Sequence, residues 1–271
     1  MNSPPASPAE FQRVAVEAAL AAGAVLRSRF RETGRLRVET KGLHDFVTEV
    51  DREAEAAAVG TILARFPGHA ILAEEGSASN STSGEGFRWI VDPLDGTTNF
   101  IHGVPVFCAS VAVEDGEGLL AGAIHDPFHD ETFEAWRGGG ARLDGRRISC
   151  SAPAILDEAL IATGFPFREL RRLDRYLVSF EAFVRTTAGI RRAGSAALDL
   201  AFVACGRYDG FWEIGLSPWD VAAGALLVRE AGGTVTDVLG GAGFLGSGDI
   251  VAANAPLHES MLRVTRDAFG G

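Results

Sequence analysis

A short apolar run that ends in two aspartates constrains the fold of this chain more than any other stretch. The segment WIVDPLDGTTNF, residues 89–100, begins with large and β-branched residues typical of a buried strand. It then places Asp92 and Asp95 three residues apart, although burying a carboxylate is costly and two neighbouring carboxylates repel each other. The fold must therefore bring compensating charge to the end of this strand.

The turn after this strand favours both an anion and a cation. Pro93 fixes its own φ and lacks a backbone donor, and Gly96 permits a tight turn before Thr97 begins a helix. Free N–H groups at a helix start favour a bound anion. Two carboxylates repel an anion unless divalent cations lie between them and bridge to phosphate oxygens. Taken alone, the same residues are also typical of an ordinary turn.

Further acids lie at the ends of other predicted elements. Glu74 and Glu75 end the strand-like segment AILAEE. Asp51 lies at the start of the second predicted helix, and Asp220 lies in the segment SPWD. Each has a structural explanation of its own, because Asp51 suits the helix dipole and Ser217 can cap the helix that contains Asp220. Only their combination would indicate a metal site.

Hydrophobic periodicity divides the chain into two differently organised halves. Between residues 106 and 150, short apolar runs separated by EDGEG, DPFHD and LDGR predict an antiparallel meander. Strand-like and helical segments alternate afterwards, so we expect an α+β fold in which two β-sheets have helices between and outside them. Residues 1–271 would then form a single unit with two lobes, about 1–150 and about 151–271. The predicted helices are Pro8–Arg31, Thr48–Phe66, Glu169–Thr186, Ser195–Cys205, Pro218–Ala231 and Leu257–Ala268.

Composition argues against several classes of protein. The net charge of −11, without a basic cluster, argues against a nucleic-acid surface. The cysteines Cys108, Cys150 and Cys205 are widely spaced and form no C-x-x-C pair, which is typical of a reducing cytoplasm. The N-terminal stretch MNSPPASPAE lacks the basic region of a signal peptide, and no apolar run reaches the ~18 residues of a membrane span. We therefore expect a cytoplasmic protein without a membrane segment.

The chain resembles the inositol monophosphatase family, a Mg²⁺-dependent and lithium-sensitive phosphatase superfamily, over nearly its whole length. WIVDPLDGTTNFIHGVP resembles the first family signature and PWDVAAGALLVREAGG resembles the second. KGLHDFVTEVD, ILAEEG, RRAGSAALDLAFVACGRYDGFWEIG and IVAAN match as well, in the family's order. The resemblance implies the layered αβαβα fold, a small-molecule phosphate monoester as substrate, and a homodimer, to which the apolar segment GVPVFCASVAV could contribute.

The resemblance also implies a site with two to three Mg²⁺ ions. The ligands would be Glu74, Asp92 and the Leu94 carbonyl for the first ion, and Asp92, Asp95 and Asp220 for the second. A third, weaker ion beside Glu74 makes that residue part of the catalytic set. The implied ligands are all oxygen atoms, which favours Mg²⁺, or Mn²⁺, over zinc.

Other matched positions have implied roles around these ions. The amides of Gly96 and Thr97 would bind a phosphate oxygen, and Asp51 with the Thr97 hydroxyl would orient and activate the attacking water. Lys41 would lie in a loop that closes over the site. The implied substrate contacts are Asp95, Gly194, Ser195, Ala196 and Glu213.

The substrate is less constrained than the reaction. Glu213 favours myo-inositol 1-phosphate, because a carboxylate can accept hydrogen bonds from two ring hydroxyls. Histidinol-phosphate phosphatase, fructose-1,6-bisphosphatase and nucleotide 3′-phosphatase are the alternatives in the same superfamily. Ser217 departs from the family pattern, since many members carry a basic or imidazole residue there. Outside this superfamily, the alternatives are a regulatory protein that has lost activity and a simple Ca²⁺-binding turn, although DPLDGTTN lacks the EF-hand spacing of acids.

Overall fold

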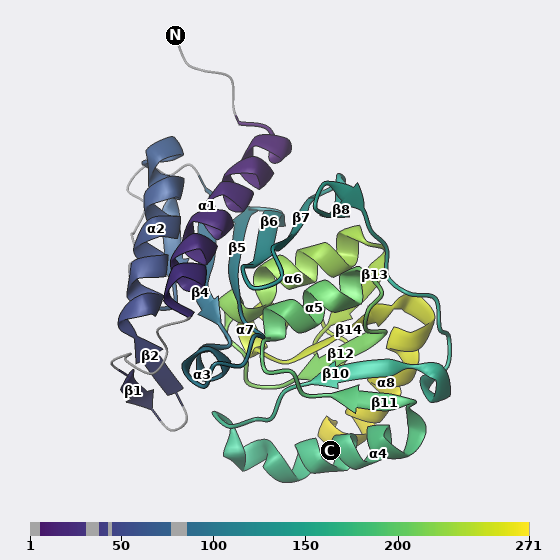
Figure 1. Ribbon diagram of the computed structural model, residues 1–271. Coiled ribbons are helices and arrows are strands. Elements are labelled where there is room, and N and C mark those ends of the chain that lie inside the picture. The colour runs from purple at the N-terminus through teal and green to yellow at the C-terminus, as the bar shows by residue number, and fades with distance from the viewer. Residues whose placement is uncertain (1–5, 31–37, 43–44, 77–85, 271) are drawn as a thin grey trace.

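The protein is built from alternating layers of helices and sheets (Figure 1). The computed structural model describes residues 6–30, 38–42, 45–76 and 86–270, and for residues 38–42 and 45–47 it describes the backbone alone. Two helices cover a seven-stranded sheet, two lie between this sheet and a five-stranded sheet, and two cover the outer face of the second sheet. This is the layered αβαβα arrangement predicted above.

The first layer consists of α1 (Pro8–Arg29) and α2 (Glu49–Arg65), which confirms both predicted helices. At the start of α1, the Ser7 side chain accepts a hydrogen bond from a backbone N–H of the first turn, and Thr48 and Asp51 form a capping box at the start of α2. Apolar residues at helical spacing then pack both helices against the seven-stranded sheet.

The seven-stranded sheet is apolar on both faces, so it must be covered on both sides. In β4, Trp89 and Val91 face α1 and α2, whereas Ile90 faces the layer between the sheets. Only the pair β3–β4 is parallel; the pairs that follow are antiparallel, which confirms the predicted meander. In sheet order the strands are β3 (Ala70–Ala73), β4 (Arg88–Asp95), β5 (Cys108–Asp115), β6 (Gly118–Asp126), β7 (Glu131–Trp136), β8 (Gly140–Leu143) and β9 (Arg146–Arg147).

The five-stranded sheet positions one side of the site. Its strand β10 pairs parallel with both β11 and β12, so the carboxyl ends of these three strands meet at one edge. β14 is antiparallel to β12 and β13. In sheet order the strands are β11 (Gly189–Arg191), β10 (Leu160–Thr163), β12 (Gly210–Glu213), β14 (Ile250–Asn254) and β13 (Gly233–Thr236).

The helices α5 (Ala196–Ala204) and α6 (Pro218–Glu230) lie between the sheets, and α4 (Leu173–Thr186) and α8 (Ala255–Phe269) lie outside, all close to their predicted ranges. The predicted start at residue 169 is wrong. A 3₁₀ turn, η3 (Leu170–Arg172), precedes α4, because no side chain caps the start of either element.

The remaining elements are short. In the described part of the chain, no helix is long and apolar enough to cross a lipid bilayer. The division into two lobes near residue 150 stays a prediction. The short elements are β1 (Val38–Gly42), β2 (Asp45–Thr48), α3 (Thr97–Ile101), η2 (Leu156–Glu158) and α7 (Phe244–Ser247).

The apolar segment GVPVFCASVAV was expected to contribute to a dimer interface. Its second half, from Cys108 to Val113, forms β5 and is buried inside the seven-stranded sheet. Val104, in the first half, is exposed. The strand half is therefore unavailable for a contact with a second subunit, because burial within the subunit accounts for its apolar character.

Candidate metal-dependent active site

A β-bulge at the end of β4 turns Asp92 and Asp95 to the same face of the sheet. Asp92 lies opposite Ser110 of β5 whereas Asp95 lies opposite Cys108, so β4 has one residue more than β5 between these pairs. Side chains three positions apart on a regular strand point to opposite faces, and one extra residue returns them to the same face. Both carboxylates therefore face the layer between the sheets, as Ile90 does.

The start of α6 brings a third carboxylate to this place. Asp220 lies in the first turn, where its Oδ2 accepts a hydrogen bond of 2.7 Å from the Ser217 N–H. One oxygen from each of Asp92, Asp95 and Asp220 lies within 4.8 Å of the other two. Three carboxylates at this separation match the all-oxygen coordination of Mg²⁺.

This cluster is electrostatically unfavourable without a cation. Burial, followed by the charges of Glu74, Asp95 and Asp220, raises the pKa of Asp92 well above its usual range. Burial and the charge of Asp220 raise the pKa of Asp95 to about 7. A divalent cation among these oxygens favours their charged forms and removes the repulsion. The donor set therefore fits a hard divalent ion.

Glu74 and Leu94 lie beside the three aspartates and line the same cavity. Glu74 directly follows β3, and its N–H donates to the Val91 carbonyl at 3.2 Å, so the backbone of β4 holds it in place. The Leu94 N–H donates to Asp92 Oδ1 at 3.0 Å. The Leu94 carbonyl accepts one hydrogen bond, from Thr97, and keeps a second lone pair for a cation.

Asp51 and Thr97 form a hydrogen-bonded pair at the edge of this cluster. Asp51 Oδ2 accepts hydrogen bonds from the Thr48 N–H at 2.9 Å and from Thr48 Oγ1 at 2.6 Å. Thr97 Oγ1 lies 3.2 Å from Asp51 Oδ1 and 3.1 Å from the Leu94 carbonyl oxygen, and its single proton serves one of them at a time. Burial raises the pKa of Asp51 although hydrogen bonds from Thr48 lower it. The pair suits a general base with a hydroxyl that orients water.

Gly96 links the acidic cluster to α3 with a backbone that other residues rarely adopt. Its φ is +96°, and a Cβ at this position would lie 2.8 Å from the Val106 carbonyl oxygen. The N–H groups at the start of α3, including that of Thr97, have no partner within the helix. They are suited to a phosphate oxygen, as the sequence predicts.

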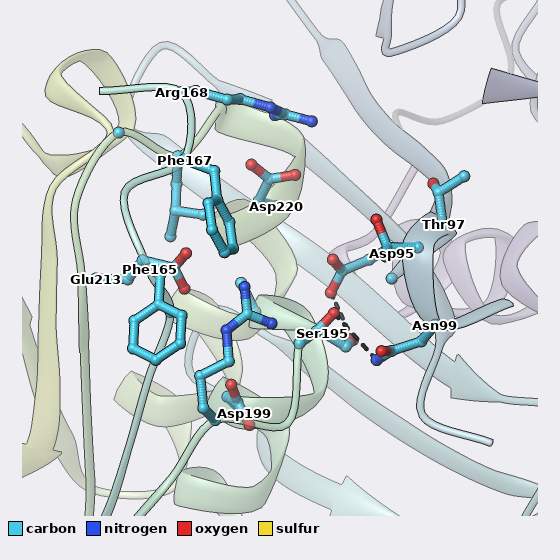
Figure 2. A pocket seen from close by; sticks show the side chains of 18 of the residues that line it. Asp95, Thr97, Asn99, Phe165, Phe167, Arg168, Ser195, Asp199, Glu213 and Asp220 are labelled. Carbon is cyan, nitrogen blue, oxygen red and sulfur yellow. Dashed lines mark hydrogen bonds between the residues drawn. The ribbon is translucent and has the colours of Figure 1, made fainter. Parts of the chain in front are cut away.

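Asp95 also attaches the start of α5 to the cluster (Figure 2). Its Oδ2 accepts hydrogen bonds from Ser195 Oγ at 2.6 Å and from a backbone N–H of the first turn of α5 at 2.7 Å. Asn99 Nδ2 donates to the Ala193 carbonyl at 2.9 Å and holds the loop before α5 against α3. Gly194 and Ser195 are therefore fixed next to the carboxylates.

These groups line a cavity of about 470 Å³ between the two sheets. The cavity opens where the parallel strands β10, β11 and β12 end, the place where ligands bind in many α/β proteins. The start of α3 and the starts of α5 and α6 face it as well. The predicted substrate contacts all line it: Asp95, Gly194, Ser195, Ala196 and Glu213.

Glu213 ends β12 and lies across the cavity from Asp95 (Figure 2). Burial raises its pKa to about 8, an effect that the positive charge of Arg192 opposes. A Cβ on Gly164 would lie only 1.9 Å from Glu213 Oε1, so this position must be glycine for Glu213 to occupy its place. Sequence reasoning did not identify Gly164, because the contact joins two strands that are far apart in the chain.

Asp199 is a further acid that the sequence analysis missed. It lies on α5, lines the cavity and is 1% exposed, and its Oδ1 has no hydrogen-bond partner among the described residues. Burial, followed by the charge of Glu213, raises its pKa well above the usual range. A lone acid within the apolar segment AALDLAFVA was a signal that could have identified it.

The rim of the cavity carries aromatic and basic side chains that the sequence analysis also missed. Phe165, Phe167 and Arg168 come from the loop after β10, and Arg192 comes from the end of β11. The stretch GFPFRE contains two exposed phenylalanines next to an arginine, which is a detectable signal, although its position at the cavity depends on the pairing of β10 with β12.

Two predictions fall wholly or partly outside the described residues. Lys41 lies in β1, of which only the backbone is described, so the position of its side chain is untested. The Ser/Gly-rich composition of SASNSTSGEG, residues 77–86, predicts a surface loop, and residues 77–85 lie outside the described part of the chain.

Comparison with known proteins gives matches over nearly the full chain. The family model described as "Inositol monophosphatase family" matches residues 7–268. A protein named Nus factor SuhB from Pseudomonas aeruginosa is 49% identical over 252 residues, which are 92% of this chain and 93% of that protein. A protein named Inositol-1-monophosphatase from Mesorhizobium japonicum is 43% identical over 253 residues, which are 93% of this chain and 95% of that protein.

The fold is similar to solved structures over the same extent. The crystal structure of extragenic suppressor protein suhB from Bartonella henselae superimposes with a TM-score of 0.90 at 42% identity, and the match covers 94% of this chain and 97% of that chain. Similarity of this extent shows that the two chains share the same fold.

Proposed function

Because this chain belongs to the inositol monophosphatase family, we propose that it hydrolyses myo-inositol 1-phosphate to inositol and phosphate in a Mg²⁺-dependent reaction. Family membership makes the chain a phosphatase, that is, a phosphoric monoester hydrolase. The observation that carries the proposal is the meeting of Asp92, Asp95 and Asp220 within 4.8 Å in a cavity that also contains Glu213.

The proposed metal ligands are those of the two ion sites described above. Glu74, Asp92 and the Leu94 carbonyl would hold one ion, and Asp92, Asp95 and Asp220 a second. The family resemblance implies a third, weaker ion beside Glu74. When bound, such ions lower the pKa of the attacking water and neutralise charge on the phosphate and on the leaving oxygen. The raised pKa values of Asp92 and Asp95 support this assignment, because burial and then the neighbouring carboxylates disfavour the charged forms unless a cation is bound.

The chain's own residues bind the phosphate and accept the proton. We assign the N–H groups of Gly96 and Thr97 to a phosphate oxygen, which holds phosphorus in line with the attacking water. The Thr97 hydroxyl orients this water, and Asp51 accepts its proton through the Thr97–Asp51 hydrogen bond of 3.2 Å. The hydrogen bonds from Thr48 keep Asp51 in the orientation that the transfer needs.

The leaving group would be bound on the opposite side of the cavity. Glu213 accepts hydrogen bonds from ring hydroxyls, while Gly194, Ser195 and Ala196 form the wall that the ring contacts. Water is partly excluded there by Phe165, which lies at the rim (Figure 2). A polyol with several hydroxyls suits a buried carboxylate better than an apolar alcohol does.

The test is phosphate release from a panel of inositol, fructose, histidinol and nucleoside 3′-phosphates, measured with Mg²⁺, with Mn²⁺ and with EDTA. We expect the highest kcat/KM for inositol 1-phosphate, no activity in EDTA, and inhibition by Li⁺ at fixed Mg²⁺. If another phosphate monoester gave a higher kcat/KM, the proposed substrate would be wrong, whereas the proposed type of reaction would stand. Equal rates with and without EDTA would contradict the metal assignment.

A second candidate function rests on a name that several relatives share. The Pseudomonas aeruginosa protein that is 49% identical is named a Nus factor, and on this basis the chain could act through a protein partner in transcription. The intact acidic cluster favours the enzyme, because a purely regulatory protein has no need to keep three mutually repelling carboxylates. If the chain acts through a protein partner, an Asp95→Asn variant should still bind that partner although it no longer releases phosphate.

Location and assembly are proposals as well. We propose a cytoplasmic enzyme, because the three cysteines are free, which is typical of proteins in a reducing compartment. We propose a homodimer on the basis of family resemblance, and size-exclusion chromatography with light scattering would test it.

A further inference from the structure

Arg192 lies at the rim of the cavity against two aromatic rings. Its guanidinium carbon is 5.3 Å from the centroid of the Phe165 ring and 5.6 Å from that of the Phe167 ring. The two rings are nearly perpendicular and lie 5.9 Å apart, so they form a corner that holds the guanidinium. Cation–π contacts of this kind fix a guanidinium through its faces and leave the N–H groups at its edges free to donate.

The N–H groups of Arg192 have no partner within the described protein, where it forms neither a hydrogen bond nor an ion pair. Other arginines of the chain are paired: Arg172 forms two hydrogen bonds with Asp249, at 2.7 and 2.6 Å, and Arg207 forms two with Glu131. Arg192 is exposed and borders the cavity. Its donors are therefore available to a ligand in the cavity.

The position of Arg192 places its charge on the leaving-group side of the site. A Cβ on Gly194 would lie 2.6 Å from an Arg192 Nη, so the guanidinium is beside the wall proposed to contact the polyol ring. Its positive charge acts on both Glu213 and Asp199, which line this side of the cavity. In Figure 2, Phe165 and Phe167 lie on the far side of the cavity from Asp95 and Thr97.

We propose that Arg192, held by Phe165 and Phe167, is a specificity-determining residue that binds a second phosphoryl group carried by the leaving group. The proposal rests on the proposed phosphatase function and adds a preference for polyol bisphosphates over the corresponding monophosphates. A planar guanidinium donates two parallel hydrogen bonds to phosphate oxygens, whereas a neutral hydroxyl offers no charge for it to pair with.

The test compares inositol 1-phosphate with inositol 1,4-bisphosphate in the full-length enzyme. In the parent we expect a kcat/KM about tenfold higher for the bisphosphate, mainly through KM; tenfold corresponds to about 1.4 kcal/mol. Arg192→Gln should remove this preference, so that the bisphosphate kcat/KM falls about tenfold more than the monophosphate kcat/KM does. Arg192→Lys should keep only part of it, because an ammonium lacks the planar pair of donors.

The matched control is Arg191→Gln, which removes an equal charge from the neighbouring exposed position outside the cavity. It should leave the preference unchanged. As a readout independent of turnover, the bisphosphate should raise the Tm of the parent more than the monophosphate does, and Arg192→Gln should abolish this difference.

Two outcomes would overturn the proposal and leave the phosphatase function intact. One is a parent enzyme that hydrolyses the monophosphate and shows no preference for the bisphosphate. The other is an Arg192→Gln variant that loses equal activity on both substrates. A parent that hydrolyses neither compound would refute the proposed function, and the preference would fall with it.

Discussion

Replacing Asp95 by Asn tests whether charge repulsion in the acidic cluster is real. Asp95 Oδ2 accepts hydrogen bonds from Ser195 Oγ at 2.6 Å and from the Ala197 N–H at 2.7 Å. The carbonyl oxygen of Asn can keep both bonds, and its amide replaces the oxygen that faces Asp92 and Asp220. We therefore expect an intact fold, loss of phosphate release, and a metal-free protein that is more stable than the parent.

The size of the stabilisation follows from the pKa of Asp95, which burial and the charge of Asp220 raise from 3.8 to about 7. At about 1.4 kcal/mol per pKa unit, keeping Asp95 charged in the folded protein costs on the order of 4 kcal/mol relative to the unfolded chain. Between these two pKa values the folded protein holds a proton that the unfolded chain has lost, so stability falls as the pH rises. The cost is absent below pH 3.8 and complete above about pH 7.

Thermal unfolding in EDTA at pH 5 and pH 8 measures this effect. Because 1 kcal/mol changes the Tm of a protein of this size class by about 2–4 °C, Asp95→Asn should raise the Tm at pH 8 by about 5 °C or more. The increase in Tm should be smaller at pH 5, because the folded parent can keep Asp95 protonated there and only part of the free-energy cost applies. Adding Mg²⁺ should stabilise the parent more than the variant.

Asp115→Asn is the matched control with the opposite sign. The hydrogen bond from Arg137 lowers the pKa of Asp115, so its charged form stabilises the folded protein at neutral pH. This variant should lower the Tm at pH 8. If Asp95→Asn instead left the metal-free Tm unchanged or lower at pH 8, with the same response to Mg²⁺ as the parent, the account of the cluster as a cation site would be refuted.

Three further substitutions test other parts of the site. Asp51→Asn should lower kcat by about 10²-fold or more with little change in KM, as expected for a lost general base, and initial rates that match the parent would contradict that role. Burial raises the pKa of Glu213 to about 8, so the parent should lose stability as the pH rises from 4.5 to 8. Glu213→Gln should flatten this part of the Tm-against-pH curve and raise KM for inositol 1-phosphate. Gly96→Ala should cost about 1–3 kcal/mol in urea unfolding, because the added Cβ meets the Val106 carbonyl in a left-handed backbone; a smaller cost would mean that the turn can relax.

Several helix starts could be predicted from residues that commonly cap helices. Ser7 and Thr48 mark the starts of α1 and α2, and Ser217 before a proline marks the start of α6. The start of α4 was mispredicted because no side chain caps it, and a 3₁₀ turn that continues into a helix leaves no distinct signal in the pattern. The starts of α1, α2 and α6 were predicted closely because a side chain caps each of them.

The meeting of the acidic residues could be predicted because one short motif contains most of them. Asp92, Leu94, Asp95, Gly96 and Thr97 lie within six consecutive residues, and a single bulge orients both aspartates. The bulge itself could not be predicted, since alternation alone would place the two carboxylates on opposite faces of β4.

The opposite wall of the cavity has no such motif, and this explains why the sequence did not indicate Arg192, Asp199 and Phe165. They reach one wall only because β10 pairs with both β11 and β12 and because α5 packs between the sheets. Arg192 and Phe165 contact each other and are not members of the acidic cluster, so either can be replaced while the cluster keeps its three carboxylates. We therefore expect Arg192→Gln to alter substrate preference while phosphate release is kept, and Asp95→Asn to abolish phosphate release from every substrate.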